Sequence, residues 1–131
     1  MKIEITFEGN KIVNANMNGM IVKTDQPVKA GGNGSAPSPF DLFLASIGTC
    51  AGIFVKSFCD QRGISTENIK LSQELEFDAV AHLVKKINIE IQVPIDFPEK
   101  YKEALVNAAN LCSVKKHLHQ PPTIEVYTKT I

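Results

Sequence analysis

The feature that most constrains this chain is one long apolar helix with clear signals at both ends. Ser38 is a favoured N-cap, Pro39 suits the first helical position, and Asp41 completes the S-x-x-D pattern of a capping box. Gly63 supplies the left-handed residue at which helices commonly end. These signals predict a helix of about 24 residues, which is about 36 Å long.

The first two-thirds of this helix are apolar on nearly every side, so the helix must be covered. The run from Phe40 to Val55 is short for a membrane span and contains Asp41, Ser46 and Thr49, which favours a buried core helix. A chain of 131 residues fits one domain, residues 1–131. Because a few strands of so small a domain are hard to wrap around such a helix, a second copy is the expected cover, and we predict a homodimer.

The rest of the sequence predicts strands in blocks around two helices. Residues 2–24 alternate as three short strands with a hairpin turn at Asn18-Gly19. Two long strands are predicted over 69–80 and 83–93, and a final strand over 123–131. Strands grouped in this way are typical of an α+β fold with antiparallel sheets.

Two further segments complete the expected order β-β-β-α-β-β-α-β. A second helix is predicted over 98–117, with Leu105, Ala108, Ala109 and Cys112 on its buried face. Residues 25–38 form a glycine-rich loop that lacks the lysine and hydroxyl spacing of a phosphate-binding loop. We interpret this loop as a flexible connector.

Composition excludes several classes of function. Fourteen basic and fourteen acidic residues cancel, and Arg62 is the single arginine, so neither nucleic acid nor a membrane is an expected partner. The N-terminus alternates like a strand and shows no secretory signal. Three cysteines are an odd number, so reduced thiols in the cytoplasm are expected rather than a disulfide framework.

The cysteines are the residues that could carry chemistry. Cys50 lies in a stripe of small residues on the apolar helix, where a cysteine by itself is more often a core residue. Cys112 lies at the end of the buried face of the second helix, and two helices facing one core could bring the two cysteines within disulfide reach. Cys59 is half a helical revolution from Cys50 and is interpreted as structural.

Metal ligands are poorly represented. The sequence has no C-x-x-C pattern, and Cys112, His117 and His119 are irregularly spaced as a ligand set. His82 falls at a predicted hairpin tip. We therefore expect no metal and no resident cofactor.

Two segments resemble the OsmC/Ohr family, which comprises osmotically inducible protein C-like and organic hydroperoxide resistance proteins. The first is S-P-F-D-L-F-L-A-S-I-G-T-C, Ser38 to Cys50, in which the cysteine follows the proline by the family's spacing of eleven residues. The second is A-A-N-L-C-S-V-K-K-H-L, Ala108 to Leu118, in which Cys112 occupies the place of the family's second cysteine. The predicted order of strands and helices agrees with the family over the whole chain.

The resemblance implies a fold and an activity. Members are intertwined homodimers whose central helices are enclosed by sheets, and active members reduce organic hydroperoxides. By position, Cys50 would be the peroxidatic thiol and Cys112 the resolving thiol. An external dithiol, of the lipoyl type for some members, then reduces the disulfide.

The chain departs from the peroxide-reducing members at the residues that assist the thiol. Phe40 stands where those members have glutamate, and the carboxylate moves one residue on, to Asp41. Arg62 is poorly placed to supply the family's activating arginine, and Lys29 is the candidate substitute as a point charge. Ser113 stands where proline is usual.

These departures leave alternatives open. One is a catalytically degenerate member that binds a small lipophilic ligand near Cys50, which Phe40 favours. Another is a hot-dog thioesterase, which also wraps a sheet around a long helix but leaves the two cysteine motifs unexplained.

Overall fold

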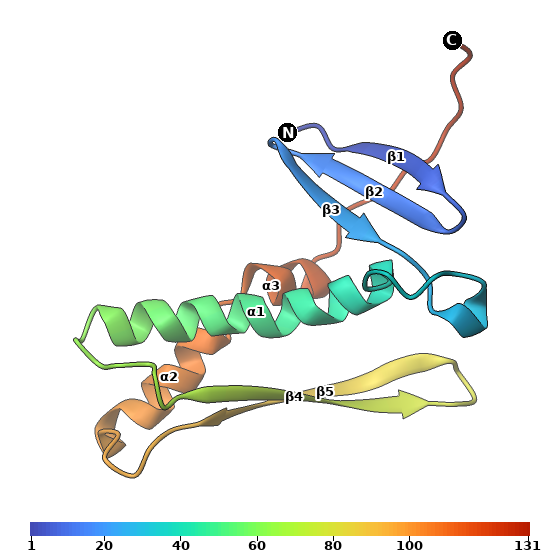
Figure 1. The fold of residues 1–131 in the computed structure, drawn as a ribbon. Coiled ribbons are helices and arrows are strands. Elements are labelled where there is room, and N and C mark those ends of the chain that lie inside the picture. Colours follow the sequence, from blue (N-terminus) through green and yellow to red (C-terminus); the bar gives the residue numbers. More distant parts are fainter. The chain divides into compact units, whose positions relative to one another are not determined.

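The computed structural model describes residues 1–131, which divide into two compact units, Met1–Ala45 and Ser46–Ile131. The relative placement of the units is not determined, so each is described by itself. Together their elements make an α+β fold with antiparallel sheets and one long helix, as predicted (Figure 1). That residues 1–131 act as one domain stays a prediction.

The N-terminal unit begins with a three-stranded antiparallel meander. Its strands, β1 (Glu4–Gly9), β2 (Ile12–Met17) and β3 (Met20–Thr24), are neighbours in chain order. Asn18 and Gly19 connect β2 to β3 with φ of 49° and 77°, and Met17 pairs with Met20. Two positive φ values in a two-residue loop match the twist of the strands, which explains the predicted hairpin.

The loop after β3 is organised around one carboxylate. Asp25 is fully buried and accepts hydrogen bonds from the backbone N–H groups of Gln26 (2.7 Å), Asn33 (3.2 Å) and Ser35 (3.0 Å), and from the Ser35 hydroxyl (2.7 Å). The Ser35 hydroxyl contributes most to lowering the pKa of Asp25 to about 2, and the backbone bonds add to it against the opposing effect of burial.

The prediction of a flexible connector was therefore wrong. A Cβ atom at Gly32 would lie 1.9 Å from the carbonyl oxygen of Gln26, so this glycine permits a close backbone approach. The loop includes a short 3-10 turn, η1 (Val28–Ala30). The glycines here serve a defined conformation rather than mobility.

Helix α1 (Pro39–Asp60) begins where the sequence predicts. The Asp41 carboxylate accepts from the backbone N–H (3.1 Å) and hydroxyl (2.7 Å) of Ser38, and the Asp41 N–H donates to the Ser38 hydroxyl oxygen (3.2 Å). This is a complete capping box. Gly63 follows the helix with φ of 64°.

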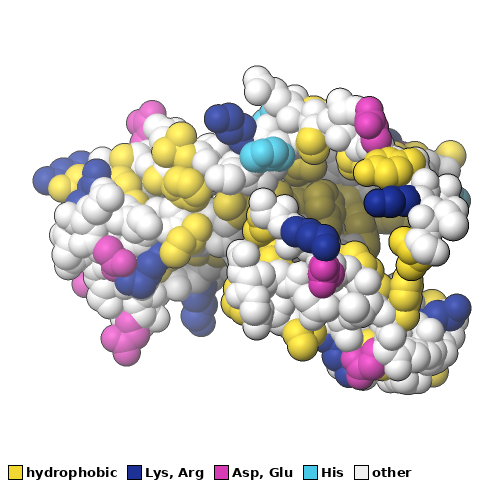
Figure 2. Space-filling view, turned by 90° about the horizontal axis from the view of Figure 1, so that it is seen from above, with side chains coloured by type: hydrophobic (Ala, Val, Ile, Leu, Met, Phe, Trp, Pro, Cys, Tyr) yellow, Lys and Arg dark blue, Asp and Glu magenta, His cyan; other side chains and the backbone are white.

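Apolar side chains of α1 remain at the surface. Phe40 is 54% exposed and Ile53 is 58% exposed. By length and composition α1 could cross a bilayer, although the core helix of a soluble protein meets the same measure. On the face drawn in Figure 2, basic and acidic side chains are interspersed, with hydrophobic side chains between them.

The C-terminal unit pairs a long hairpin with a compact core. Strands β4 (Lys70–Asp78) and β5 (Leu83–Gln92) are antiparallel, with Gln73 opposite Ile89. Alternation along β5 puts its isoleucines on one half-buried face. The buried core cluster consists of Val55, Phe58, Cys59, Phe97 and Leu105.

The single second helix predicted over 98–117 is in fact three pieces. They are η2 (Glu99–Tyr101), α2 (Lys102–Ala109) and α3 (Ser113–His119). The break falls at Cys112, whose backbone is extended (φ −49°, ψ 124°) and whose side chain caps α3. A side chain that accepts the N–H three residues on starts a new helix, and apolar spacing alone does not register this.

The final strand predicted over 123–131 is also absent. These residues form neither helix nor strand, and their apolar side chains are exposed. Alternation marks which side chains share a face, but a strand also needs a neighbour to bond its backbone.

Candidate functional site

Cys50 lies on α1 with its thiol directed at the start of α3. The half-buried sulfur accepts hydrogen bonds from the backbone N–H groups of Val114 and Ser113 and from the Cys112 thiol. The Val114 N–H contributes most to lowering the pKa of Cys50, the Cys112 thiol comes next, and burial opposes them. Donors aimed at a sulfur stabilise its thiolate.

Cys112 is the N-cap of α3 and is almost fully buried, at 2% exposure. Its sulfur accepts the backbone N–H of Lys115 at 3.4 Å. Burial contributes most to raising the pKa of Cys112, and its thiol hydrogen bond to Cys50 adds to this. The two thiols are thus unlike: the pKa of Cys50 lies below its ordinary value and that of Cys112 lies above it, so Cys50 is the first of the two to lose its proton.

The structure therefore brings Cys50 and Cys112 into direct hydrogen-bond contact as free thiols. The predicted position of Cys112 on the buried face of one continuous helix was wrong, because Cys112 lies in the break before α3. Cys59, half a revolution away on α1, is fully buried in the core cluster.

The two proposed assisting residues belong to the N-terminal unit, Met1–Ala45. The Asp41 carboxylate is occupied in the capping box, and its hydrogen bonds to Ser38 lower its pKa. Lys29 lies in η1 and is exposed. Assistance from either residue stays a prediction.

The groups that surround Cys50 in this structure are not apparent from the sequence. Backbone N–H groups leave no mark in residue type, so the donors at Ser113 and Val114 could be found only by recognising Cys112 as a cap. Cysteine is not among the favoured N-cap residues, so the sequence carries no clear signal for this cap.

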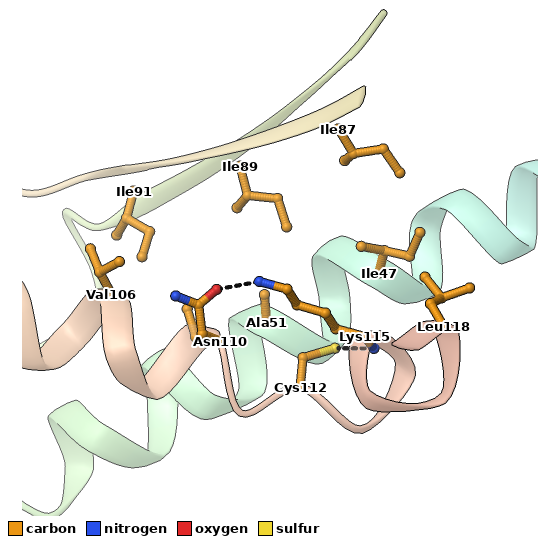
Figure 3. A pocket seen from close by; sticks show the side chains of 11 residues that line it. Ile47, Ala51, Ile87, Ile89, Ile91, Val106, Asn110, Cys112, Lys115 and Leu118 are labelled. Atoms are coloured by element: carbon orange, nitrogen blue, oxygen red, sulfur yellow. Dashed lines mark hydrogen bonds between the residues drawn. The ribbon is translucent and has the colours of Figure 1, made fainter. Parts of the chain in front are cut away.

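A cavity of about 330 Å³ lies beside Cys112 (Figure 3). Its walls come from α1, β5, α2 and α3, and include Ile47, Ile87, Ile89, Ile91 and Leu118. Lys115 reaches into it, and its ammonium donates to the Asn110 side-chain oxygen at 2.6 Å. No three His, Cys, Asp or Glu side chains are grouped as metal ligands.

The chain resembles known proteins both in its sequence pattern and in its fold. The pattern of the family described as OsmC-like protein matches residues 32–127. No curated protein matches the chain.

Several solved structures share the fold. One from Psychrobacter arcticus 273-4, a putative osmotic stress induced and detoxification response protein, has 23% identity and a TM-score of 0.73 over 88% of this chain and 86% of that one. The organic hydroperoxide resistance protein OsmC of Legionella pneumophila has 19% identity and a TM-score of 0.53, over 90% and 89%. The corresponding protein OhrB of Bacillus subtilis has 20% identity and a TM-score of 0.53, over 92% and 93%.

These likenesses concern the fold, and the family match spans most of the sequence. The OsmC-like fold is a soluble one. The chain therefore belongs to the OsmC-like protein family.

Proposed function

We propose that this protein is a thiol peroxidase that reduces organic hydroperoxides through Cys50 and Cys112. The observation that carries the proposal is the hydrogen bond between two unlike thiols, with backbone N–H groups aimed at Cys50. Solved relatives of the same fold are named for organic hydroperoxide resistance, which supports this class of substrate.

In the first step, the Cys50 thiolate attacks the terminal oxygen of the hydroperoxide. The O–O bond breaks, and the leaving alkoxide takes a proton to become an alcohol. Cys50 keeps one oxygen as a sulfenic acid. Backbone donors replace the missing arginine in this scheme, because they favour the thiolate without a cationic side chain.

In the second step, the Cys112 sulfur attacks the Cys50 sulfur. An S–S bond forms, and the sulfenic oxygen leaves as water with the Cys112 proton. An external dithiol, of the lipoyl type in our proposal, then supplies two electrons and ends as a disulfide itself. No resident cofactor takes part.

The experiment is turnover of cumene hydroperoxide with dihydrolipoamide as reductant. We expect Cys50→Ser to abolish turnover. We expect Cys112→Ser to stop after one equivalent, with a sulfenic acid at Cys50 that dimedone traps. Cys59→Ser is the matched control and should retain turnover. Unchanged turnover in Cys50→Ser would refute the assignment.

A second candidate is a binding protein without peroxidase activity, which the apolar cavity beside Cys112 favours. In that case peroxide is not consumed by the wild-type protein. Native mass spectrometry of the purified protein would then show a bound small molecule.

We further propose that the protein acts as a homodimer in the cytoplasm, where dithiols are kept reduced. The exposed Ile53 on α1 supports the dimer, because a helix this apolar is rarely left open to water. Sedimentation equilibrium of wild type and Ile53→Glu tests it. A monomeric wild type would contradict the proposal.

A further inference from the structure

The cavity beside Cys112 combines apolar walls with a single charge. Ile87, Ile89 and Ile91 line one side from β5, and Ile47 on α1 and Leu118 on α3 line the other side (Figure 3). Lys115 is the one charged residue in the lining, and no acidic residue belongs to it. A volume of about 330 Å³ is near the lower end of the range of roughly 300–1,000 Å³ for ligand sites.

The Lys115 ammonium is held in place but not neutralised. Its backbone is fixed in the first turn of α3 by the bond to the Cys112 sulfur, and its side chain donates to the Asn110 amide oxygen at 2.6 Å. An amide oxygen accepts a hydrogen bond but carries no net charge. The lysines that do pair with carboxylates are Lys2, Lys56, Lys85, Lys86 and Lys102.

We infer that this cavity binds an aliphatic carboxylate whose alkyl chain fits within a volume of about 330 Å³. The alkyl chain lies along the β5 isoleucines, and the carboxylate pairs with the Lys115 ammonium. One cation beside an apolar wall matches a ligand with one negative charge and an apolar tail. The inference rests on the cavity that favours the second candidate function and names a ligand class for it, but it does not require that peroxidase activity be absent.

The test is calorimetric titration of the reduced full-length protein with sodium octanoate and, in parallel, with 1-octanol, at pH 7.5. We expect octanoate to bind more tightly than octanol. Lys115→Met keeps the apolar stem and removes the charge, so it should weaken octanoate binding about tenfold and leave octanol binding unchanged. Lys116→Met, on the same helix but outside this cavity, is the matched control and should change neither.

A second variant locates the site independently of charge. Ile89→Trp places a larger side chain in the cavity and should abolish binding of both ligands while circular dichroism stays that of wild type. The titrations are repeated in a Cys50→Ser background, so that loss of peroxidase chemistry does not affect the result. Equal affinity for octanol and octanoate, octanoate binding unchanged by Lys115→Met, or no binding because a second copy covers the cavity would each overturn the inference.

Discussion

Replacing Ser113 by proline tests whether backbone donors activate Cys50. Ser113 is the first residue of α3, and its N–H donates to the Cys50 sulfur. Proline removes that N–H and suits the first helical position, where the N–H has no partner within the helix. The substitution should therefore delete one donor and leave α3 in place.

The size of the effect follows from the kind of bond. A hydrogen bond to a charged group contributes about 1.5–3 kcal/mol, and because the Cys50 sulfur is only half-buried and this donor is the weakest of the set, we take about 1 kcal/mol. Losing it raises the pKa of Cys50 toward its ordinary value. The thiolate fraction at neutral pH should therefore fall, by at most about fivefold for a loss of about 1 kcal/mol.

The assay is the rate of Cys50 alkylation by iodoacetamide at pH 7, followed by peptide mass spectrometry. Ser113→Ala is the matched control because it keeps the backbone N–H and should alkylate like wild type. Equal alkylation rates for Ser113→Pro and Ser113→Ala would show that the Ser113 N–H does not activate Cys50, and would favour activation by a cationic side chain instead.

Further predictions concern stability. Gly32→Ala should lower the urea midpoint by the equivalent of about 2 kcal/mol or more, because a Cβ would meet the Gln26 carbonyl oxygen at 1.9 Å, whereas Gly52→Ala in the helix should raise stability by about 0.5–1 kcal/mol. The pKa of Asp25 is lowered from 3.8 to about 2, so its stabilisation is complete above pH ~4 and is lost as pH falls toward 2, as urea titrations at each pH will show. Leu105→Ala should cost about 2–5 kcal/mol in thermal unfolding, since the side chain is 98% buried in the core cluster (2% exposed).

Each of these has a result that would contradict it. An unchanged midpoint in Gly32→Ala would mean that the loop is not held against Gln26. Asp25→Asn should flatten the pH dependence between pH 4 and 2, and an identical acid profile in wild type and variant would exclude Asp25 as its source. A Leu105→Ala variant as stable as wild type would place that side chain outside the core.

Local signals were sufficient for some of the regular elements. Ser38 and Asp41 fixed the start of α1, and the Asn18-Gly19 turn fixed the β2–β3 hairpin, because caps and tight turns depend on residues adjacent in sequence. The contact between Cys50 and Cys112 was reachable only as a possibility, since it depends on how α1 and α3 pack.

The features that were missed depend on groups that residue type does not reveal. Asp25 organises its loop through N–H groups as far away as Ser35, and any residue could supply a backbone N–H. No local pattern distinguishes Lys115 from the other lysines, because its setting depends on Asn110 and on the isoleucines of β5. The tail over 123–131 lacks a strand because alternation does not provide a neighbouring strand edge.

The cap formed by Cys112 has an evolutionary consequence. A descendant that abandoned thiol chemistry would still need a side chain there to begin α3, and serine is among the residues that do this best, whereas cysteine is not. A single base change can convert a cysteine codon to a serine codon, so this substitution is easily reached and would strengthen the start of α3. Whether related chains keep cysteine at this position, where serine caps better, is therefore a test of the proposed thiol role that needs no activity assay.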